Sequence, residues 1–176
     1  MGLEMWINKV NVKTDDVEHI NEIISYNHYK NKDIPTPEEV QAYIEKKGWT
    51  KEKDLDKIEE YKKTLREERY RYEGLIELYE EEDPGYENVI SWAKNYLLNA
   101  VMEDWCRKVV GEEIKLNGLK IILKKEDIKK IVQRYREKLS RYDIKEENVK
   151  RAIMPFKKIL EETNFEEETL YYSSWW

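Results

Sequence analysis

Basic residues gather in residues 107–158, and clustered lysines and arginines are the groups that bind phosphates. This segment holds 17 lysines and arginines against 8 aspartates and glutamates, a net charge of +9. The rest of the chain holds 15 basic and 30 acidic residues, so the whole chain carries a net charge of −6. Such asymmetry within one chain is typical of a surface for phosphates or for an acidic partner. The pattern favours a class of function and names no biological process.

Groups that could catalyse a reaction or hold a metal are few and scattered. His19 and His28 are nine residues apart, and the only cysteine, Cys106, lies in an apolar segment. These positions match no metal-binding spacing, and the sequence has no glycine-rich phosphate loop, nucleophile elbow or His-Glu-x-x-His run. We therefore predict no enzymatic activity, no cofactor, no metal and no small-molecule substrate. A single cysteine allows no intrachain disulfide, which is typical of a reducing compartment.

The basic residues should project together from an amphipathic helix over residues 125–141. Apolar residues recur there at three- and four-residue steps and form one stripe. Lys130, Arg134 and Arg141 fall roughly opposite this stripe, with Lys138 near them. A second apolar stripe follows after residues 140–142, in a helix that should kink or restart at Pro155 because proline donates no backbone hydrogen bond. The predicted nucleic-acid-binding residues are Lys124, Lys125, Lys130, Arg134, Lys138, Arg141, Lys150 and Arg151.

The two helices and the short turn between them resemble a helix-turn-helix unit. The resemblance covers about thirty residues and implies that polar residues early in the second helix face a DNA groove. The first helix is longer than in most such units. The alternative interpretation is a solvated helical face whose bases pair with acids elsewhere in the chain. Because the sequence pI is about 5.3, any contact with nucleic acid should be a local patch.

The chain ends in an acidic and aromatic stretch, residues 163–176. Residues 161–168 contain five glutamates and no base, and five aromatic residues lie among residues 165–176. Such a stretch could dock into a partner's basic, apolar groove, or fold back over the basic segment. It could equally cover an edge of the core, because two tryptophans left in water would form a sticky patch. The predicted partner-binding residues are Phe165, Tyr171, Tyr172, Trp175 and Trp176.

Local signals predict the elements that position these groups. Thr36, Pro37 and the acids after them are typical of a helix start, and Gly48 suits the left-handed position after that helix. Asn117-Gly118 indicates a two-residue β-hairpin turn, and Pro84-Gly85 indicates a turn between two long helices. The expected elements are a strand over 5–12, helices over 15–26, 36–48, 50–83 and 86–110, and a β-hairpin over 113–123.

These elements predict a mainly α protein. We expect a helical bundle built on a long antiparallel helix hairpin, with one small β-hairpin at about 113–123 and a basic C-terminal helical module. Residues 1–162 should form a single domain, with possible sub-modules 1–110 and 111–162, and residues 163–176 a tail. We expect no signal peptide, no membrane span and a cytoplasmic location. The abundance of lysine, glutamate and isoleucine resembles the composition of thermophile proteins.

Two functions fit these predictions. The favoured one is a non-catalytic nucleic-acid-binding protein, or a small helical subunit of a nucleoprotein complex, that contacts phosphates through residues 107–158. The alternative is a protein–protein adaptor or inhibitor, of a kind that a virus or plasmid could encode, that acts through the acidic–aromatic tail and the helix hairpin. DNA and RNA are not distinguished by the sequence.

Overall fold

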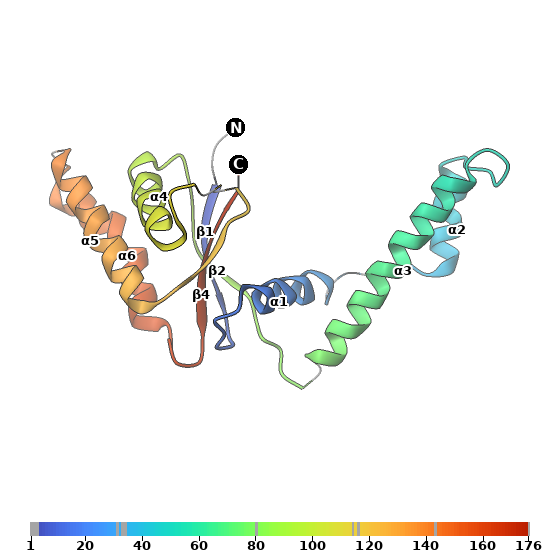
Figure 1. The fold of residues 1–176 in the computed structure, drawn as a ribbon, viewed down its shortest axis with the longest axis horizontal. Coiled ribbons are helices and arrows are strands. Elements are labelled where there is room, and N and C mark those ends of the chain that lie inside the picture. The colour runs from blue at the N-terminus through green and yellow to red at the C-terminus, as the bar shows by residue number, and fades with distance from the viewer. Residues whose placement is uncertain are drawn as a thin grey trace. The chain divides into compact units, whose positions relative to one another are not determined.

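The computed structural model describes residues 4–30, 32, 35–79, 81–113, 115, 117–142 and 144–175, with only the backbone of residue 175. The described residues form six helices and four strands, so the protein is mainly helical with a small antiparallel sheet (Figure 1). Contacts divide the chain into two compact units, Met1–Ile20 with Pro84–Trp176, and Asn21–Asp83. We call them the sheet unit and the α2–α3 unit. That the chain folds as a single domain stays a prediction.

The sheet brings together strands from both ends of the sequence. All three pairings are antiparallel, and the strand order is β2-β1-β4-β3. Ile7 of β1 pairs with Ile90 of β2 and with Tyr172 of β4, which pairs in turn with Ile121 of β3. Paired residues lie on the same face, so this face is apolar. The strands are β1 Glu4–Val10, β2 Glu87–Ala93, β3 Lys120–Leu123 and β4 Thr169–Trp175.

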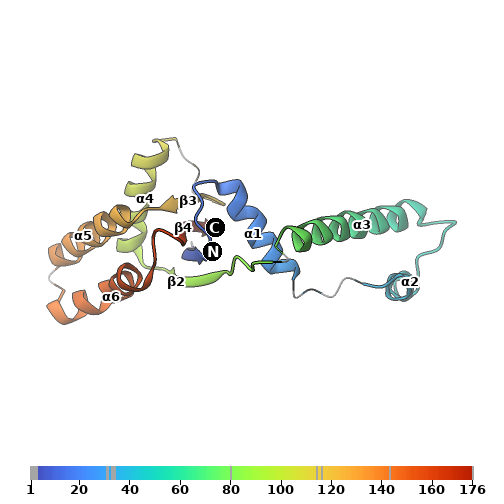
Figure 2. The same ribbon diagram turned by 90° about the horizontal axis from the view of Figure 1, so that it is seen from below.

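Three helices cover the apolar face of the sheet: α4 Tyr96–Val110, α5 Lys125–Arg141 and α6 Glu146–Glu162. Figures 1 and 2 show all three on the same side of the strands. Their apolar stripes and the sheet form one buried core, which includes Trp105, Tyr135 and Phe156. Asn95 caps α4 by accepting a hydrogen bond from the Leu98 N–H at 3.1 Å, and its side-chain amide donates to the Tyr135 hydroxyl at 2.9 Å. The same residue therefore starts α4 and joins it to α5.

A polar cluster lies on the opposite face of the sheet. Asn8 is only 2% exposed, yet its side chain is satisfied. Its amide donates to Ser173 Oγ at 3.0 Å, and its carbonyl oxygen accepts from Asn88 at 2.9 Å and from the Tyr86 hydroxyl at 3.2 Å. The cluster joins β1, β2 and β4.

The α2–α3 unit has a much smaller buried core. It contains α2 Pro37–Lys46 and α3 Leu55–Leu78, and α1 Val17–Tyr29 begins in the sheet unit and ends in this one. The predicted start of α2 is confirmed, because the Thr36 N–H donates to Glu39 Oε2 at 2.8 Å and the Glu39 N–H donates to Thr36 Oγ1 at 3.3 Å. The predicted left-handed glycine after α2 is confirmed as well, since Gly48 has a φ of +67°.

The predicted helix over residues 86–110 is wrong in its first part. Residues 87–93 form β2, and the helix begins only at Tyr96. Val89, Ile90 and Trp92 favour a strand, and Asn95 caps the helix that follows. The turn at Pro84-Gly85 therefore leads into a strand, and no antiparallel pair of long helices forms there. The helix predicted over 50–83 is present but shorter, as α3.

The predicted β-hairpin over 113–123 is not found among the described residues. Lys120–Leu123 is a strand, but it pairs with β4. Ile114 and Leu116, in the other predicted strand, lie outside the described residues. Gly118 has the positive φ, +72°, that was expected of the turn, and its N–H donates to the Ser174 carbonyl at 2.9 Å. This hydrogen bond thus joins the turn to β4.

The structure tests two further predictions. α6 continues through Pro155 and does not restart there. Within the part of the chain that the structure describes, no helix has both the length and the apolar content that a bilayer span requires.

Candidate nucleic-acid interface

The helix α5 makes different contacts on three of its sides. Ile128, Ile131, Tyr135 and Leu139 are buried in the core. Arg136, on a second side, donates to Glu146 of α6 at 3.0 Å. Lys138, on a third side, lies 3.5 Å from Asp104 of α4. At 100° per residue, Arg134 and Arg141 share this third side with Lys138.

Arg134, Lys138 and Arg141 line one shallow depression between α4 and α5, together with Lys108 of α4. Its volume is about 160 Å³, and we call it the α4–α5 depression. The residues that line it are Val101, Asp104 and Lys108 from α4, and Arg134, Glu137, Lys138 and Arg141 from α5. The prediction that Arg134, Lys138 and Arg141 lie together on one outer face agrees with this geometry. Lys130, one turn before Arg134, is exposed on the same side of α5.

Three of the four basic residues that line this depression make no ion pair with a residue that the structure describes. Lys138 is paired with Asp104. Lys108, Arg134 and Arg141 make no ion pair with any residue that the structure describes. Because these guanidinium and ammonium groups are not occupied by carboxylates, they can donate hydrogen bonds to an added anion.

The other predicted basic residues do not line this depression. Lys124 lies at the start of α5, where its backbone N–H donates to Asp127 at 3.0 Å and its side chain is exposed. The Lys125 ammonium lies 5.7 Å from the centre of the Phe165 ring, so this lysine contacts the loop after α6. Lys150 and Arg151 are exposed on α6. The predicted set is therefore divided over different surfaces.

Lys108 lines the α4–α5 depression but is not among the predicted nucleic-acid-binding residues. It was counted in the basic segment but not placed with the phosphate-binding residues, because it lies on a different helix. Lys108 follows Val101 and Asp104 by seven and four residues, so all three lie on one side of α4. That spacing was visible in the sequence, but the packing of this side against α5 was not.

The C-terminal stretch is part of the sheet. Tyr171 and Tyr172 are 1% and 0% exposed, in the inner strand β4, so their side chains offer no surface to a partner. This burial raises the pKa of both hydroxyl groups. Phe165 is half-buried against the core, and the Trp175 side chain and Trp176 lie outside the described residues. The burial of Tyr171 and Tyr172 agrees with the interpretation that the C-terminal stretch covers an edge of the core.

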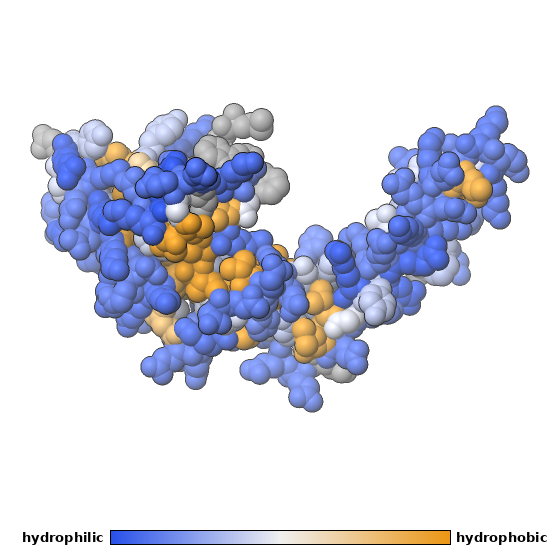
Figure 3. Space-filling model, viewed as in Figure 1, coloured by the Kyte–Doolittle hydropathy of each residue, from blue (hydrophilic) through white to orange (hydrophobic). Residues whose placement is uncertain are grey.

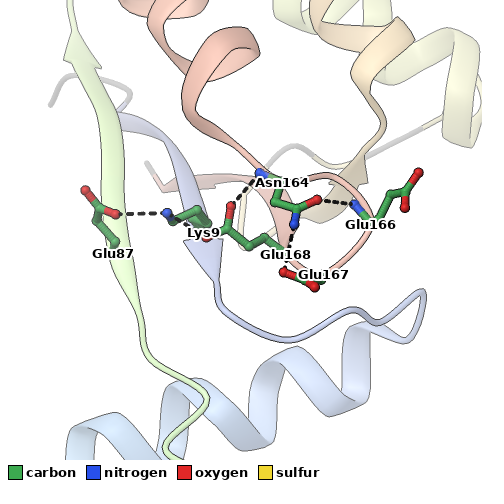
Figure 4. A network of polar contacts seen from close by, with 6 residues as sticks. All are labelled: Lys9, Glu87, Asn164, Glu166, Glu167 and Glu168. Carbon is green, nitrogen blue, oxygen red and sulfur yellow. Dashed lines mark hydrogen bonds and ion pairs between the residues drawn. The ribbon is translucent and has the colours of Figure 1, made fainter.

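The acidic residues before β4 hold the loop in place (Figure 4). Glu168 accepts from the Asn164 N–H at 2.8 Å and pairs with Lys9 at 2.9 Å, and Glu167 accepts from the Asn164 side chain at 2.7 Å. Lys9 also lies 3.5 Å from Glu87. The hydrogen bond from Lys9 to Glu168 is the main reason that the pKa of Lys9 is raised. These carboxylates therefore have partners within the sheet unit.

The two histidines and the cysteine do not form a common site with one another. Cys106 is fully buried in the core, and this burial raises the pKa of its thiol to about 12. His28 contacts the ring of Tyr29. In the described part of the chain, no three His, Cys, Asp or Glu side chains are grouped as a metal site.

The surface over α5 and α6 is mainly hydrophilic, whereas apolar side chains gather nearer the strands (Figure 3).

The chain matches no family model, no curated protein and no solved structure. The function is therefore inferred from the geometry of the sites alone.

Proposed function

We propose that the protein is a non-catalytic nucleic-acid-binding protein or a subunit of a nucleoprotein complex, and that the α4–α5 depression binds the phosphate backbone. The observation that supports this most is the grouping of Lys108, Arg134 and Arg141 around one depression without ion pairs to the described residues. A protein that neutralises phosphates releases counterions, and this release favours binding.

The spacing of the basic residues suits a backbone. Arg134 and Arg141 lie seven residues apart on α5, which is about 10 Å along the helix axis. Successive phosphates of one strand of duplex DNA advance by about 3.4 Å along its axis. The two arginines, with Lys138 between them, are therefore close enough together to contact neighbouring phosphates of one strand. Rigid helices hold the groups in place before binding, which lowers the entropic cost of binding.

The acidic residues in the depression limit how much charge it offers. Asp104 occupies Lys138, and Glu137 lies on the same rim. We therefore expect three or four phosphate contacts, weak affinity and little sequence preference, because phosphate contacts alone carry no sequence information. The helix-turn-helix arrangement of α5 and α6 stays a prediction, and Lys150 and Arg151 on α6 would form a second, separate contact.

The experiment measures fluorescence anisotropy of labelled strands of about 20 nucleotides, as single strands and duplexes of DNA and of RNA. We expect binding at about 50 mM salt that weakens towards 200 mM, with log K falling against log salt at a slope of about −3 for a duplex. If none of the four nucleic acids binds at the lower salt concentration, the proposal is overturned. Equal binding to polyglutamate, with the same salt dependence, would instead indicate an acidic protein as the ligand.

A further inference from the structure

The α2–α3 unit carries a groove between the start of α2 and the middle of α3. Its volume is about 440 Å³, and we call it the α2–α3 groove. The apolar residues that line it are Pro35, Pro37, Val40 and Leu65, and the basic ones are Lys62, Arg66 and Arg69. All of them belong to the same compact unit. Figures 1 and 2 show α2 beside the N-terminal half of α3.

The walls of this groove are fixed by local structure. The Thr36–Glu39 capping box sets the direction of the first turn of α2. At the other end of α2, the Tyr43 ring stacks on the Tyr61 ring of α3 with centroids 4.8 Å apart, and Trp49 packs edge-on against both. The Tyr43–Tyr61 stack thus holds the two helices together at the C-terminal end of α2, and the groove lies at its N-terminal end.

The basic residues of the groove form one row on α3. Lys62, Arg66 and Arg69 follow each other at four- and three-residue steps, so they share one side of the helix. Arg66 Nε donates to the Lys62 carbonyl at 3.2 Å, which holds the guanidinium group along the helix. Arg69 pairs with Glu73 at 2.9 Å, whereas Lys62 and Arg66 make no ion pair with a described residue. Two cations therefore border an apolar floor.

We propose that the α2–α3 groove docks a short acidic, amphipathic segment of a partner protein. Aliphatic or aromatic side chains at three- or four-residue spacing would contact Val40, Leu65 and the prolines, and carboxylates of the same segment would pair with Lys62 and Arg66. The volume of the groove is in the range of sites that hold a few side chains. The mainly apolar floor distinguishes it from the α4–α5 depression and favours a peptide over a phosphate backbone. This docking is independent of the proposed nucleic-acid binding.

The test is a selection of displayed random peptides on the immobilised full chain. The selected peptides are then synthesised with a fluorescent label, and their affinity is measured by anisotropy. We expect peptides with net negative charge and two apolar residues three or four apart. The double variant Lys62→Glu with Arg66→Glu should weaken binding at least tenfold, because it replaces both cations with carboxylates that repel an acidic peptide. Both side chains are exposed, so their reversal leaves the core intact. Leu65→Ser should weaken it as well.

The matched control is Lys51→Glu with Lys53→Glu, a reversal of equal size at exposed positions of the same unit outside the groove, which should change the affinity less than twofold. Three results would overturn the proposal: no enriched peptide, enriched peptides without acidic residues, or acidic peptides that bind the Lys62 and Arg66 double variant as well as the unaltered chain. Concentration-dependent dimerisation in sedimentation experiments that is lost in the double variant would also overturn it, since the occupant would then be a second copy of the chain.

Discussion

At the scale of single residues, Asn8 makes the most hydrogen bonds of any side chain in the polar cluster of the sheet. It makes three side-chain hydrogen bonds while almost fully buried. Asn8→Ala should lower the free energy of unfolding by about 2–3 kcal/mol, because it removes three hydrogen bonds of a buried side chain, each of which contributes about 1 kcal/mol. Urea denaturation measures this loss. Asn88→Ala is the control, since Asn88 is exposed and shares only one of these bonds, and it should cost about 1 kcal/mol or less. Equal losses for the two variants would contradict a structural role for Asn8.

Cys106 gives a second prediction at this scale. Its thiol is buried and its pKa is raised to about 12, so at pH 8 only about one thiol in ten thousand is ionised, and the thiolate is the reactive form. A thiol reagent should therefore modify the folded protein at pH 8 only as fast as the core opens, and modify it rapidly in denaturant. Rapid labelling without denaturant would show that Cys106 is accessible and that α4 is not packed as described.

At the scale of elements, β4 is central because it lies between β1 and β3. Tyr172→Ala should lower the free energy of unfolding by about 3–5 kcal/mol, the cost of removing a large buried side chain. Tyr96→Ala is the matched control: Tyr96 is 79% exposed, so the same substitution there should change stability by less than about 0.5 kcal/mol. Denaturation curves of the two variants that coincide would contradict the inner position of β4 and restore a docking role for the C-terminal stretch.

The elements that could be predicted are those whose signals are local. α2 was identified from Thr36, Pro37 and Gly48, and α5 from its apolar spacing, because helices are stabilised within a few residues of the chain. β2 and β4 could not be predicted in the same way. Tyr171 and Tyr172 pair with residues of β1 more than 160 positions earlier, and no local pattern reveals a partner at that distance. The aromatic residues were visible, but whether they cover a core or bind a partner depends on that pairing.

The same limit applies to the candidate site. The periodicity of α5 placed Arg134, Lys138 and Arg141 on one side of a helix, and the structure agrees. It could not show that α4 packs beside that side and brings Lys108 and Asp104 to it. Nor could the charge count show that Lys125 contacts Phe165 or that Glu167 and Glu168 bind the loop before β4.

At the scale of the whole molecule, the large core and the α4–α5 depression both belong to the sheet unit. Replacing residues 31–82 with a short glycine–serine linker should therefore leave a cooperatively folding protein that still binds nucleic acid. The linker can be short, because Lys30 Nζ and Asp83 Oδ2 lie 2.8 Å apart. Circular dichroism during thermal unfolding and the anisotropy measurement test the two expectations. Loss of cooperative unfolding would show that the sheet unit depends on the α2–α3 unit.

The proposed function is tested most directly by the salt dependence of nucleic-acid binding in charge-reversal variants. Arg134→Glu combined with Arg141→Glu removes two phosphate contacts, so it should weaken duplex binding at least tenfold and reduce the magnitude of the slope of log K against log salt by about 1.8. Lys51→Glu with Lys53→Glu is the control, with the same change in net charge at exposed positions of the α2–α3 unit outside the α2–α3 groove, and it should leave the slope unchanged. Equal losses of affinity and slope in both double variants, or no loss in either, would contradict binding at the α4–α5 depression.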